Sequence, residues 1–387
     1  MAKLTDVCDF QGGSQPPKEE WSFEEQDGYI RMLQIRDFTQ SERVTPEYIK
    51  ISGTTKICEA DDILVARYGA SLGKILTGLA GAYNVAIMRT IPNETVLTKK
   101  YLYYYLKSPY FQTSILNVGS RAAQAGFNKE DLSKLDINCP SFEEQDNIVH
   151  VLQKVENVIK NREIELDKLD DLIKARFVEL FGDPKSNPLE WPVVNISKVV
   201  GGKVSNGFFA KRDDYCEDGN VSVLGVANIV NRMYSRLDDL PRTNADDKDI
   251  AKFEVKYGDM LFCRSSLVAE GIGKASIIPE NVQGNILFEC HVIRLPLDLS
   301  KCVPEFMQVL STMDYFRNQV IAQSKTATMT TIGQDGILKT DIILPPFVKQ
   351  KEFYDFVKQV DKSKVAVQKA LDETQLLFDS LMQEYFG

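Results

Sequence analysis

The sequence contains little of what catalytic and metal sites are most often built from. It has only two histidines, His150 and His291, and its seven cysteines include no Cys-x-x-Cys pair. Histidine is the most frequent general base, and structural zinc sites need closely spaced cysteines, so neither kind of site is expected. An odd number of scattered cysteines also argues against a disulfide framework. Reduced thiols and a cytoplasmic location are the expectation.

Long apolar runs are absent as well. No stretch approaches the roughly 20 apolar residues of a membrane helix, so no membrane contact is expected. The N-terminal residues lack the basic flank and apolar stretch of a signal peptide. With 43% hydrophobic and 26% charged residues, the composition is typical of a soluble globular protein. A length of 387 residues favours more than one domain.

The sequence also lacks the positive charge that is typical of nucleic-acid-binding proteins. Its net charge is −9, whereas binding to DNA depends on neutralising phosphates with lysine and arginine. The excess is unevenly distributed, because residues 142–184 hold 6 basic and 11 acidic side chains. Residues 1–141 hold 16 and 17, and residues 185–345 hold 18 and 20. Each of these larger segments can therefore present one basic face, and the net charge excludes no partner.

What the sequence does contain is an internal repeat with an offset of 205 residues. Residues 137–145 (INCPSFEEQ) match residues 342–350 (IILPPFVKQ), and residues 179–182 (ELFG) match residues 384–387 (EYFG) at the same offset. Looser matches lie earlier, with residues 62–67 against 259–264 and residues 28–33 against 219–224. Chance similarity rarely keeps register without a gap from residue 126 to 182. We interpret the chain as an internal duplication.

Each copy begins with about 140 to 160 residues of short apolar runs separated by Gly, Asn and Asp, which favours a β-rich globule with some helix. The expected strands are residues 29–35, 63–66 and 84–88 in the first copy and 221–226, 260–263 and 287–293 in the second. The expected helices are residues 100–107 and 304–310.

Each copy ends in a long helix with a coiled-coil pattern. Apolar residues alternate spacings of three and four over more than five heptads, with no Pro or Gly inside. The predicted seam consists of Ile148, Leu152, Val155, Ile159, Leu166, Leu169 and Ile173 in the first helix and Phe353, Val357, Val360, Val367, Leu371, Phe378 and Leu381 in the second. Arg162, Arg176 and Lys364 interrupt this seam, and we expect them to snorkel or to pair with acidic residues across it. Fixing the register is the alternative role.

The predicted fold class is α+β. Two similar β-rich globules are joined by two long helices that form an antiparallel coiled coil about a pseudo-two-fold axis. The expected domains are residues 1–141, a helix over 142–184, residues 185–346 and a helix over 347–387. A helix of about 40 residues spans about 60 Å, so it would hold two unequal surfaces apart. Duplex DNA offers equivalent groove faces about every 34 Å, which suits a target of two short sequences with an unread spacer.

The chain resembles the specificity subunits of type I restriction-modification systems. The resemblance lies in the duplicated layout, in the helix after each turn, and in the Pro-x-Phe-x-x-Gln turns themselves, which consist of Pro140, Phe142 and Gln145 and of Pro345, Phe347 and Gln350. It covers nearly the whole chain and is strongest over residues 126–182 and 331–387. It implies that residues 1–141 and 185–346 are target recognition domains, each reading one half of a bipartite asymmetric site in double-stranded DNA.

The same resemblance implies partners and excludes catalysis by this chain. The helices would set the spacer and dock two methyltransferase (modification) subunits, and the full complex would add two restriction/translocase subunits. Those partners would carry out adenine methylation and ATP-dependent DNA cleavage. They, and not this chain, would therefore hold S-adenosylmethionine, ATP and magnesium. The chain itself is expected to be a non-catalytic recognition subunit without a cofactor.

Two other functions stay open. A free-standing DNA methyltransferase would need Asp or Asn before Pro-Pro-Phe, whereas this chain has Leu344, which cannot grip the target amine. A coiled-coil scaffold whose globules bind protein or glycan is the alternative from another class. The glycine-rich segments 69–74 and 271–274 have the wrong spacing for a phosphate loop, and we interpret them as turns that leave Lys74 and Lys274 free to meet phosphate.

Candidate DNA contacts are Arg and Lys for phosphate or guanine, and Asn, Gln and Thr for bases, in segments that we expect to be loops. In the first globule they are Arg31, Arg36, Lys74, Arg121, Gln124 and Lys129, and in the second Lys211, Arg212, Asn228, Arg232, Lys274, Lys325, Thr326 and Thr328. About half of the true contacts are expected to go to the DNA backbone.

Overall fold

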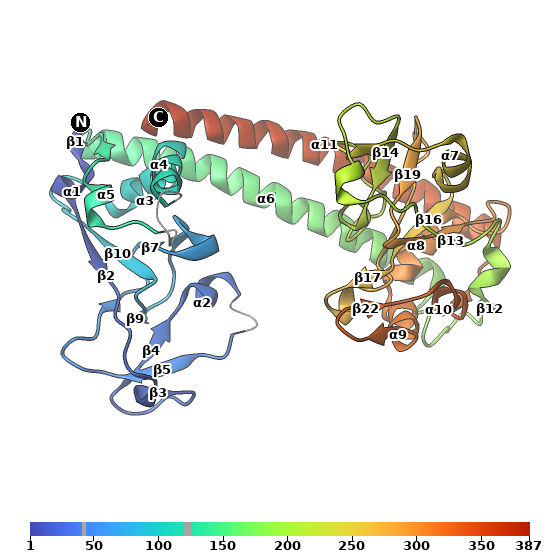
Figure 1. Cartoon of the computed structure of the whole chain (residues 1–387), viewed down its shortest axis with the longest axis horizontal. Coiled ribbons are helices and arrows are strands. Elements are labelled where there is room, and N and C mark those ends of the chain that lie inside the picture. The colour runs from blue at the N-terminus through green and yellow to red at the C-terminus, as the bar shows by residue number, and fades with distance from the viewer. Residues whose placement is uncertain (41–43, 120–125) are drawn as a thin grey trace. The chain divides into compact units, whose positions relative to one another are not determined.

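The computed structural model describes residues 1–40, 44–119 and 126–387, and Figure 1 shows its helices and strands. The chain divides into two compact units. Unit 1 consists of Met1–Glu163 and Lys369–Gly387, and unit 2 consists of Ile164–Gln368. Each unit therefore contains one globule and parts of both long helices, α6 (Phe142–Phe181) and α11 (Phe347–Phe386).

Both globules are built on an antiparallel four-stranded sheet with the same strand order. In unit 1 the order is β2 (Cys8–Gly12), β10 (Ile87–Pro92), β7 (Leu64–Ala66) and β8 (Ile75–Leu76). In unit 2 it is β13 (Ser205–Asn206), β20 (Val292–Pro296), β16 (Asp259–Cys263) and β18 (Ala275–Ile277). The sheet topology therefore reproduces the duplication that the sequence indicates.

A second sheet in each unit is built around one parallel strand pair. These pairs are β4 (Tyr29–Leu33) with β9 (Gly81–Tyr83) in unit 1 and β14 (Val221–Leu224) with β19 (Ile286–Phe288) in unit 2. Around them lie β3 (Trp21–Ser22), β5 (Glu47–Lys50), β6 (Ile57–Cys58) and β15 (Arg242–Thr243). The smaller sheets pair β1 (Ala2–Lys3) with β11 (Asp136–Ile137), β12 (Val193–Asn195) with β23 (Asp341–Ile343), and β22 (Thr330–Thr331) with both β17 (Ser265–Ser266) and β21 (Lys325–Thr326).

Short helices cover these sheets in the same order in both units. The matching helices are α3 (Lys99–Lys107) and α8 (Pro304–Thr312), α4 (Pro109–Gly119) and α9 (Asp314–Ala322), and α5 (Lys129–Leu132) and α10 (Gln334–Leu338). The remaining ones are α1 (Leu4–Val7), α2 (Ile35–Thr39) and α7 (Asp247–Phe253). Helices α3 and α8 begin 205 residues apart, as do α6 and α11, so the offset read from the sequence holds through all of these helices.

Most of the predicted strands and helices are confirmed, with two corrections. The prediction of a strand over residues 84–88 is wrong for its first part, because β9 ends at Tyr83 and β10 begins only at Ile87. The prediction of a single strand over residues 287–293 is wrong, because β19 ends at Phe288 and β20 begins only at Val292. The Glu289 carboxylate accepts a hydrogen bond from the Val226 amide at 2.8 Å, which holds the intervening residues in a turn. His291 lies in this exposed turn and not in an apolar strand.

The predicted seam residues lie on sheltered faces of α6 and α11 in each unit. Every predicted seam residue is buried or half-buried, and Leu152, Phe353 and Val357 are fully buried. In unit 2 the helices run antiparallel, because Arg176 pairs with Glu352 at 3.3 Å while Lys364 pairs with Asp170 at 2.6 Å. These ion pairs confirm for Arg176 and Lys364 the expectation that charged seam residues pair with acidic residues across the seam, whereas for Arg162 it stays a prediction.

The helix ends carry a second apolar face that the heptad pattern did not reveal. In unit 2 Phe177 lies off the seam but is fully buried, and its ring stacks on Phe306 of α8 at 5.4 Å. In unit 1 Phe386 lies 5.1 Å from the ring of Tyr101 on α3. One face of each helix end therefore contacts the other long helix while a second face completes the core of a globule.

The glutamine of the Pro-x-Phe-x-x-Gln turn makes equivalent hydrogen bonds in both copies of the repeat. The Gln145 amide accepts a hydrogen bond from the Thr98 backbone N–H at 2.9 Å and donates to the Pro140 carbonyl at 3.0 Å. Gln350 repeats these bonds with Val303 at 2.9 Å and with Pro345 at 2.8 Å. Each buried glutamine therefore ties the start of a long helix to the start of α3 or α8.

Unit 2 also contains a buried carboxyl group that neighbouring charges and hydrogen bonds compensate poorly. Glu305 on α8 is 1% exposed, and its Oε1 accepts a hydrogen bond from the Tyr234 hydroxyl at 3.2 Å. Its Oε2 has no hydrogen-bond partner among the described residues. Burial raises the pKa of the Glu305 carboxyl from 4.5 to about 7. The folded chain therefore favours the protonated form, and ionisation above about pH 7 destabilises unit 2.

Replacing this carboxyl by an amide is expected to stabilise the protein at alkaline pH. Because the pKa of Glu305 is raised in the folded chain, protonation of this carboxyl stabilises the folded state. The stabilisation is complete below pH 4.5 and is lost as the pH rises to about 7. Glu305→Gln should therefore raise the unfolding free energy by up to about 3 kcal/mol at pH 8 and by little at pH 4.5. Urea denaturation at both pH values measures this difference, with exposed Glu217→Gln as the control. An equal effect at both pH values would contradict the buried-carboxyl interpretation.

Candidate nucleic-acid interface

In unit 2, the loops that carry candidate DNA contacts leave the four-stranded sheet at one end. Asn206 pairs with Ile293 and Cys263 pairs with Val292, so the last residues of β13 and β16 lie beside the first residues of β20. The start of β18 lies at the same end, because Ala275 pairs with Phe262. Loops 207–215, 264–274 and 289–291 therefore emerge together.

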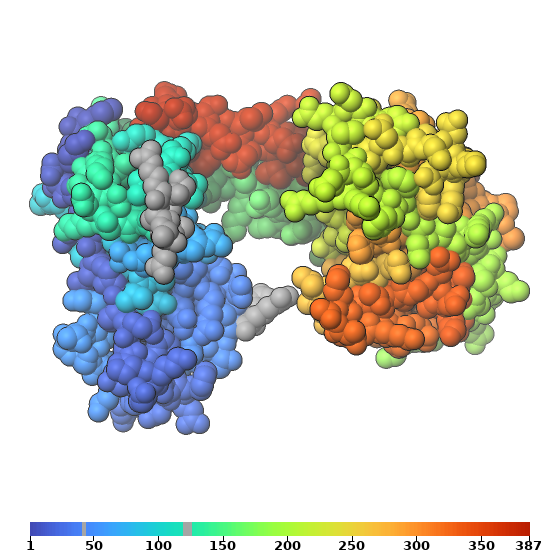
Figure 2. All heavy atoms as spheres, in the orientation of Figure 1, coloured from blue at the N-terminus to red at the C-terminus, as the bar shows by residue number. Residues whose placement is uncertain are grey.

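Two further segments join this end of unit 2. The hairpin of β21 and β22 pairs with β17, which directly follows β16. The turn at Val226 is held to Glu289 by the hydrogen bond described above. Seven of the eight second-globule candidates come from these segments, and the exception is Arg232. On the face of unit 2 in Figure 2, yellow-green residues from its first part lie side by side with gold and orange residues from its later part. We call this set of segments the loop end of unit 2.

Unit 1 has an equivalent loop end. Gly12 pairs with Met88 and Ala66 pairs with Ile87, so loops 13–17, 67–74 and 84–86 emerge together. A glycine follows the edge strand in both units because the backbone there approaches a neighbour closely. A Cβ on Gly13 would lie 2.1 Å from the Asn84 carbonyl oxygen, and one on Gly207 would lie 2.2 Å from that of Glu289. Gly13 and Gly207 therefore occupy equivalent positions, although neither lies in a segment where the sequence repeat was recognised.

The glycine-rich segments are turns, as expected. Short 3-10 helices occupy Gly69–Ser71 and Ala269–Gly271, and each is followed by a glycine in the left-handed region, with φ of 80° at Gly73 and 64° at Gly273. Lys74 is exposed at the loop end of unit 1. The Lys274 ammonium is not free, because it donates a hydrogen bond to the Asn231 side chain at 2.7 Å.

Four second-globule candidates are exposed and available. Lys211, Arg212, Lys325 and Thr328 are exposed at the loop end of unit 2. Among the residues that the structure describes, no carboxylate lies within ion-pair distance of the Lys211, Arg212 or Lys325 side chain. Unpaired cations on loops are suited to contact phosphates or guanine.

The other second-globule candidates are engaged within the protein. The Asn228 side chain accepts a hydrogen bond from the Gly225 amide at 3.0 Å. The Thr326 and Thr330 hydroxyls lie 3.0 Å apart. The Arg232 Nε donates to the Val230 carbonyl at 3.3 Å, and Arg232 lines a pocket with Lys274. These side chains shape the loops, and their assignment as DNA contacts stays a prediction.

In unit 1, three of the candidates are held in ion pairs. Arg31 pairs at 2.8 Å with Asp37, which is buried, and Arg36 pairs with Glu47. Lys129 bonds to Asp9 near the beginning of β2, and this hydrogen bond lowers the pKa of the Asp9 carboxyl. Arg121 and Gln124 lie outside the described residues. Lys74 is thus the one described first-globule candidate that is exposed at the loop end and not held in an ion pair.

Apolar and aromatic side chains that were not among the predicted DNA contacts are exposed at both loop ends. In unit 2, Phe209 is 68% exposed and Leu267 is 83% exposed. In unit 1 the exposed Tyr68 ring lies 5.1 Å from the guanidinium of Arg67. Aromatic and apolar side chains contact thymine methyl groups and base faces, so they suit the same interface. The signals in the sequence were two apolar pairs, Phe208 with Phe209 and Leu267 with Val268, each within a polar segment.

No group of three or more His, Cys, Asp or Glu side chains that could hold a metal ion occurs in the part of the chain that the structure describes. Within that part, no helix is long and apolar enough to cross a membrane. All seven cysteines are free thiols, as expected.

Comparisons with known proteins agree with the duplicated fold. Residues 1–169 match the family described as "Type I restriction modification DNA specificity domain". The MjaVIII specificity subunit of a type I restriction enzyme from Methanocaldococcus jannaschii is 22% identical over 353 residues, covering 87% of this chain and 80% of the relative. The MjaIX specificity subunit from the same organism is 20% identical, covering 99% of this chain and 91% of the relative.

Solved structures share the fold over the whole chain. A chain in a structure of complex assembly and conformational transition of the type I R-M system has a TM-score of 0.55 and 16% identity, covering 100% of this chain and 96% of that one. A type I S subunit from M. genitalium has a TM-score of 0.50 and 13% identity, covering 100% and 95%. The specificity-domain match over residues 1–169, the two relatives and the shared fold together show that this chain is similar, over nearly its whole length, to type I restriction-modification specificity subunits.

Proposed function

We propose that this DNA sequence-specificity subunit reads a bipartite site, with the loop end of each unit reading one half. The observation that carries the proposal is the repetition of the loop end. Two sheets of identical strand order present loops with exposed lysine side chains at the same end of the sheet, at Lys74 between β7 and β8 in unit 1 and at Lys211 after β13 in unit 2. The loop sequences differ between the units, so the two half-sites would differ and the site would be asymmetric.

The long helices would set the spacer and dock two methyltransferase subunits. Their pseudo-equivalent surfaces supply one docking place for each unit, which supports a pair of identical partners on a single chain. Two restriction/translocase subunits would complete a nuclease. The chain would recognise DNA without catalysing a reaction, and it would act in the cytoplasm. S-adenosylmethionine, ATP and magnesium would be bound by the partners.

Removing cationic side chains from the loop end of unit 2 is expected to lower the affinity for DNA and to make that affinity depend less steeply on salt concentration. We choose Arg212→Ala with Lys325→Ala, in the complex of this chain with its methyltransferase subunits and duplex DNA. Removing one cation that neutralises a phosphate should reduce the slope of log K against log salt by about 0.9, so the double variant should reduce it by up to about 2. Fluorescence anisotropy over a salt series measures the slope.

The matched control removes two exposed lysines from the opposite end of the same sheet, with Lys198→Ala and Lys203→Ala. The bridge between Val200 and Leu297 places that segment beside the last residues of β20. The control should bind DNA like the unaltered chain. Equal affinity and slope for the unaltered chain and for the Arg212 and Lys325 variant would contradict the assignment of the loop end as the DNA-binding face.

A further inference from the structure

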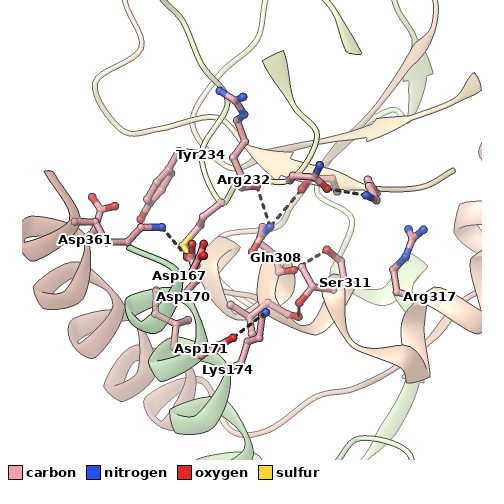
Figure 3. Close-up of a pocket in the computed structure, with 18 residues that line it drawn as sticks. Asp167, Asp170, Asp171, Lys174, Arg232, Tyr234, Gln308, Ser311, Arg317 and Asp361 are labelled. Carbon is pink, nitrogen blue, oxygen red and sulfur yellow. Dashed lines mark hydrogen bonds and ion pairs between the residues drawn. The ribbon is translucent and has the colours of Figure 1, made fainter. Parts of the chain in front are cut away.

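A cavity of about 800 Å³ lies within unit 2, between the long helices and the globule. Figure 3 shows Asp167, Asp170 and Asp171 of α6 on one side, with Gln308 and Ser311 of α8 facing them. Asp361 of α11 completes the acidic side. The cavity is open to solvent, so a side chain of another protein can enter it.

Unit 1 has no such arrangement of small side chains at the corresponding place. At the offset of 205 residues, Glu156 corresponds to Asp361, and Lys107 corresponds to Thr312. The Glu156 carboxylate accepts hydrogen bonds from the Lys107 ammonium at 2.7 Å and from the Tyr104 hydroxyl at 2.9 Å. The Lys107 ammonium also lies 3.2 Å from the Tyr103 hydroxyl. This junction therefore supplies its own cation and fills its own space.

Residue differences between the two copies of the repeat explain why unit 2 has this cavity. Tyr103 and Tyr104 correspond to Gln308 and Val309, and Leu106 corresponds to Ser311. Phe378, whose ring lies 6.5 Å from that of Tyr104 in unit 1, corresponds to Ile173. Each of these side chains is smaller in unit 2, so the same backbone framework leaves the space empty.

The same substitutions leave an acidic group without a cation. Among the described residues, none donates a hydrogen bond to the half-buried Asp361 carboxylate, whereas Glu156 has two donors. Burial raises the pKa of Asp361, and the neighbouring Asp170 raises it further although Lys364 lowers it. A cation in the cavity would relieve this cost, as Lys107 does in unit 1.

The basic side chains around the cavity are committed to other groups. Lys364 pairs with Asp170 at 2.6 Å, and Lys174 pairs with Asp171 at 3.4 Å. Arg317 Nη2 donates to the Glu270 carbonyl at 2.9 Å, while its buried Nη1 has no hydrogen-bond partner among the described residues. Lys274 is bonded to Asn231. Figure 3 shows the Arg232 guanidinium directed away from the long helices.

We propose that this cavity receives a lysine or arginine side chain of a methyltransferase subunit, whose charged end takes the place beside Asp361 that Lys107 takes beside Glu156 in unit 1. Apolar residues of the lining, among them Ile173 and Val309, suit the aliphatic stem of such a side chain. The assignment rests on the proposed function. It also makes the two docking places unequal, because identical partners would meet an acidic cavity in unit 2 and a filled junction in unit 1.

The test uses the full chain and purified methyltransferase subunit, with native mass spectrometry and titration to resolve the two binding steps. Asp361→Asn removes the acidic group, and Thr312→Lys supplies a cation from the chain itself at an exposed position of α8. Each variant should weaken one of the two binding steps by about tenfold or more and leave the other unchanged. Exposed Asp355→Asn and Asn318→Lys are the matched controls, and they should bind like the unaltered chain.

The outcomes separate this assignment from the proposed function. Two unchanged binding steps in both the Asp361→Asn and Thr312→Lys variants would overturn the cavity assignment while leaving the proposed function in place. A loss of both binding steps with an unchanged melting temperature would also overturn it, because the cavity belongs to unit 2 alone. Failure of the unaltered chain to bind any methyltransferase subunit would overturn both.

Discussion

Exchanging residues 1–141 for the corresponding segment of a relative with another specificity is expected to change one half of the methylated DNA site and to leave the other half unchanged. The reason is that the loop end of each unit is built from strands of that unit alone. The donor segment should keep aromatic residues at positions 101 and 105, because both rings contact Phe386 of α11. Single-molecule sequencing of genomic DNA for methyladenine reads both halves.

The reciprocal exchange of residues 185–346 is the matched control, and it should change only the half that the first exchange preserves. Its donor segment should keep an aromatic residue at position 306, because this ring packs on both Phe177 and Phe181 of α6. Unchanged methylation after either exchange would contradict modular recognition. So would loss of both halves in a complex that still assembles.

Lengthening one long helix is expected to abolish function, whereas lengthening both should restore assembly with a longer spacer. Seven residues inserted between Glu163 and Ile164 extend α6 by about 10 Å, while α11 keeps its length. Each unit contains a part of α6 and a part of α11. When only α6 is lengthened, the seam contacts cannot be kept in both units at once, so those of one unit must break. A matching insertion between Gln368 and Lys369 adds two whole turns to α11 and keeps each unit's own contacts.

Methylation of genomic DNA separates these cases. The single insertion should give no sequence-specific methylation, and the paired insertion should give the original half-sites with a spacer longer by up to about three base pairs, at 3.4 Å per base pair. An unchanged spacer in the paired variant, or normal methylation with the single insertion, would contradict the view that the helices set the spacing.

The duplicated framework could be predicted because it depends on local patterns. The sequence repeat keeps a constant offset through α6 and α11. The heptad spacing in these helices identified seam residues such as Leu152 and Val357, which are buried. The two glutamines, Gln145 and Gln350, were visible as a motif. Their bonds to Thr98 and Val303 were not predictable, since these partners lie 47 residues away in the chain.

The second apolar face of the helices escaped prediction for a related reason. Phe177 and Phe386 lie off the seam, and only the packing of a globule against the helix end explains why they are buried. A heptad pattern reports the contact between two helices and is silent about a third element. The strand over residues 287–293 was wrong because Glu289 bonds to a distant amide, at Val226, that an apolar run does not reveal.

The availability of individual cations could not be read from the sequence. Arg31 and Lys325 are equivalent as residue types, yet Arg31 is tied to a buried carboxylate and Lys325 is exposed. Whether a basic side chain is free depends on which acidic residues the fold brings beside it. The same holds for Glu305 and Asp361, whose raised pKa values follow first from burial.

The most direct test of the central claim is the methylation pattern made by the unaltered chain. The chain and its methyltransferase subunit are expressed in a host without adenine methylation, and genomic methyladenine is mapped at single-base resolution. We expect one asymmetric motif of two short sequences separated by an unread spacer of fixed length, and no methylation when this chain is omitted. A continuous motif, or the same methylation without this chain, would contradict the account.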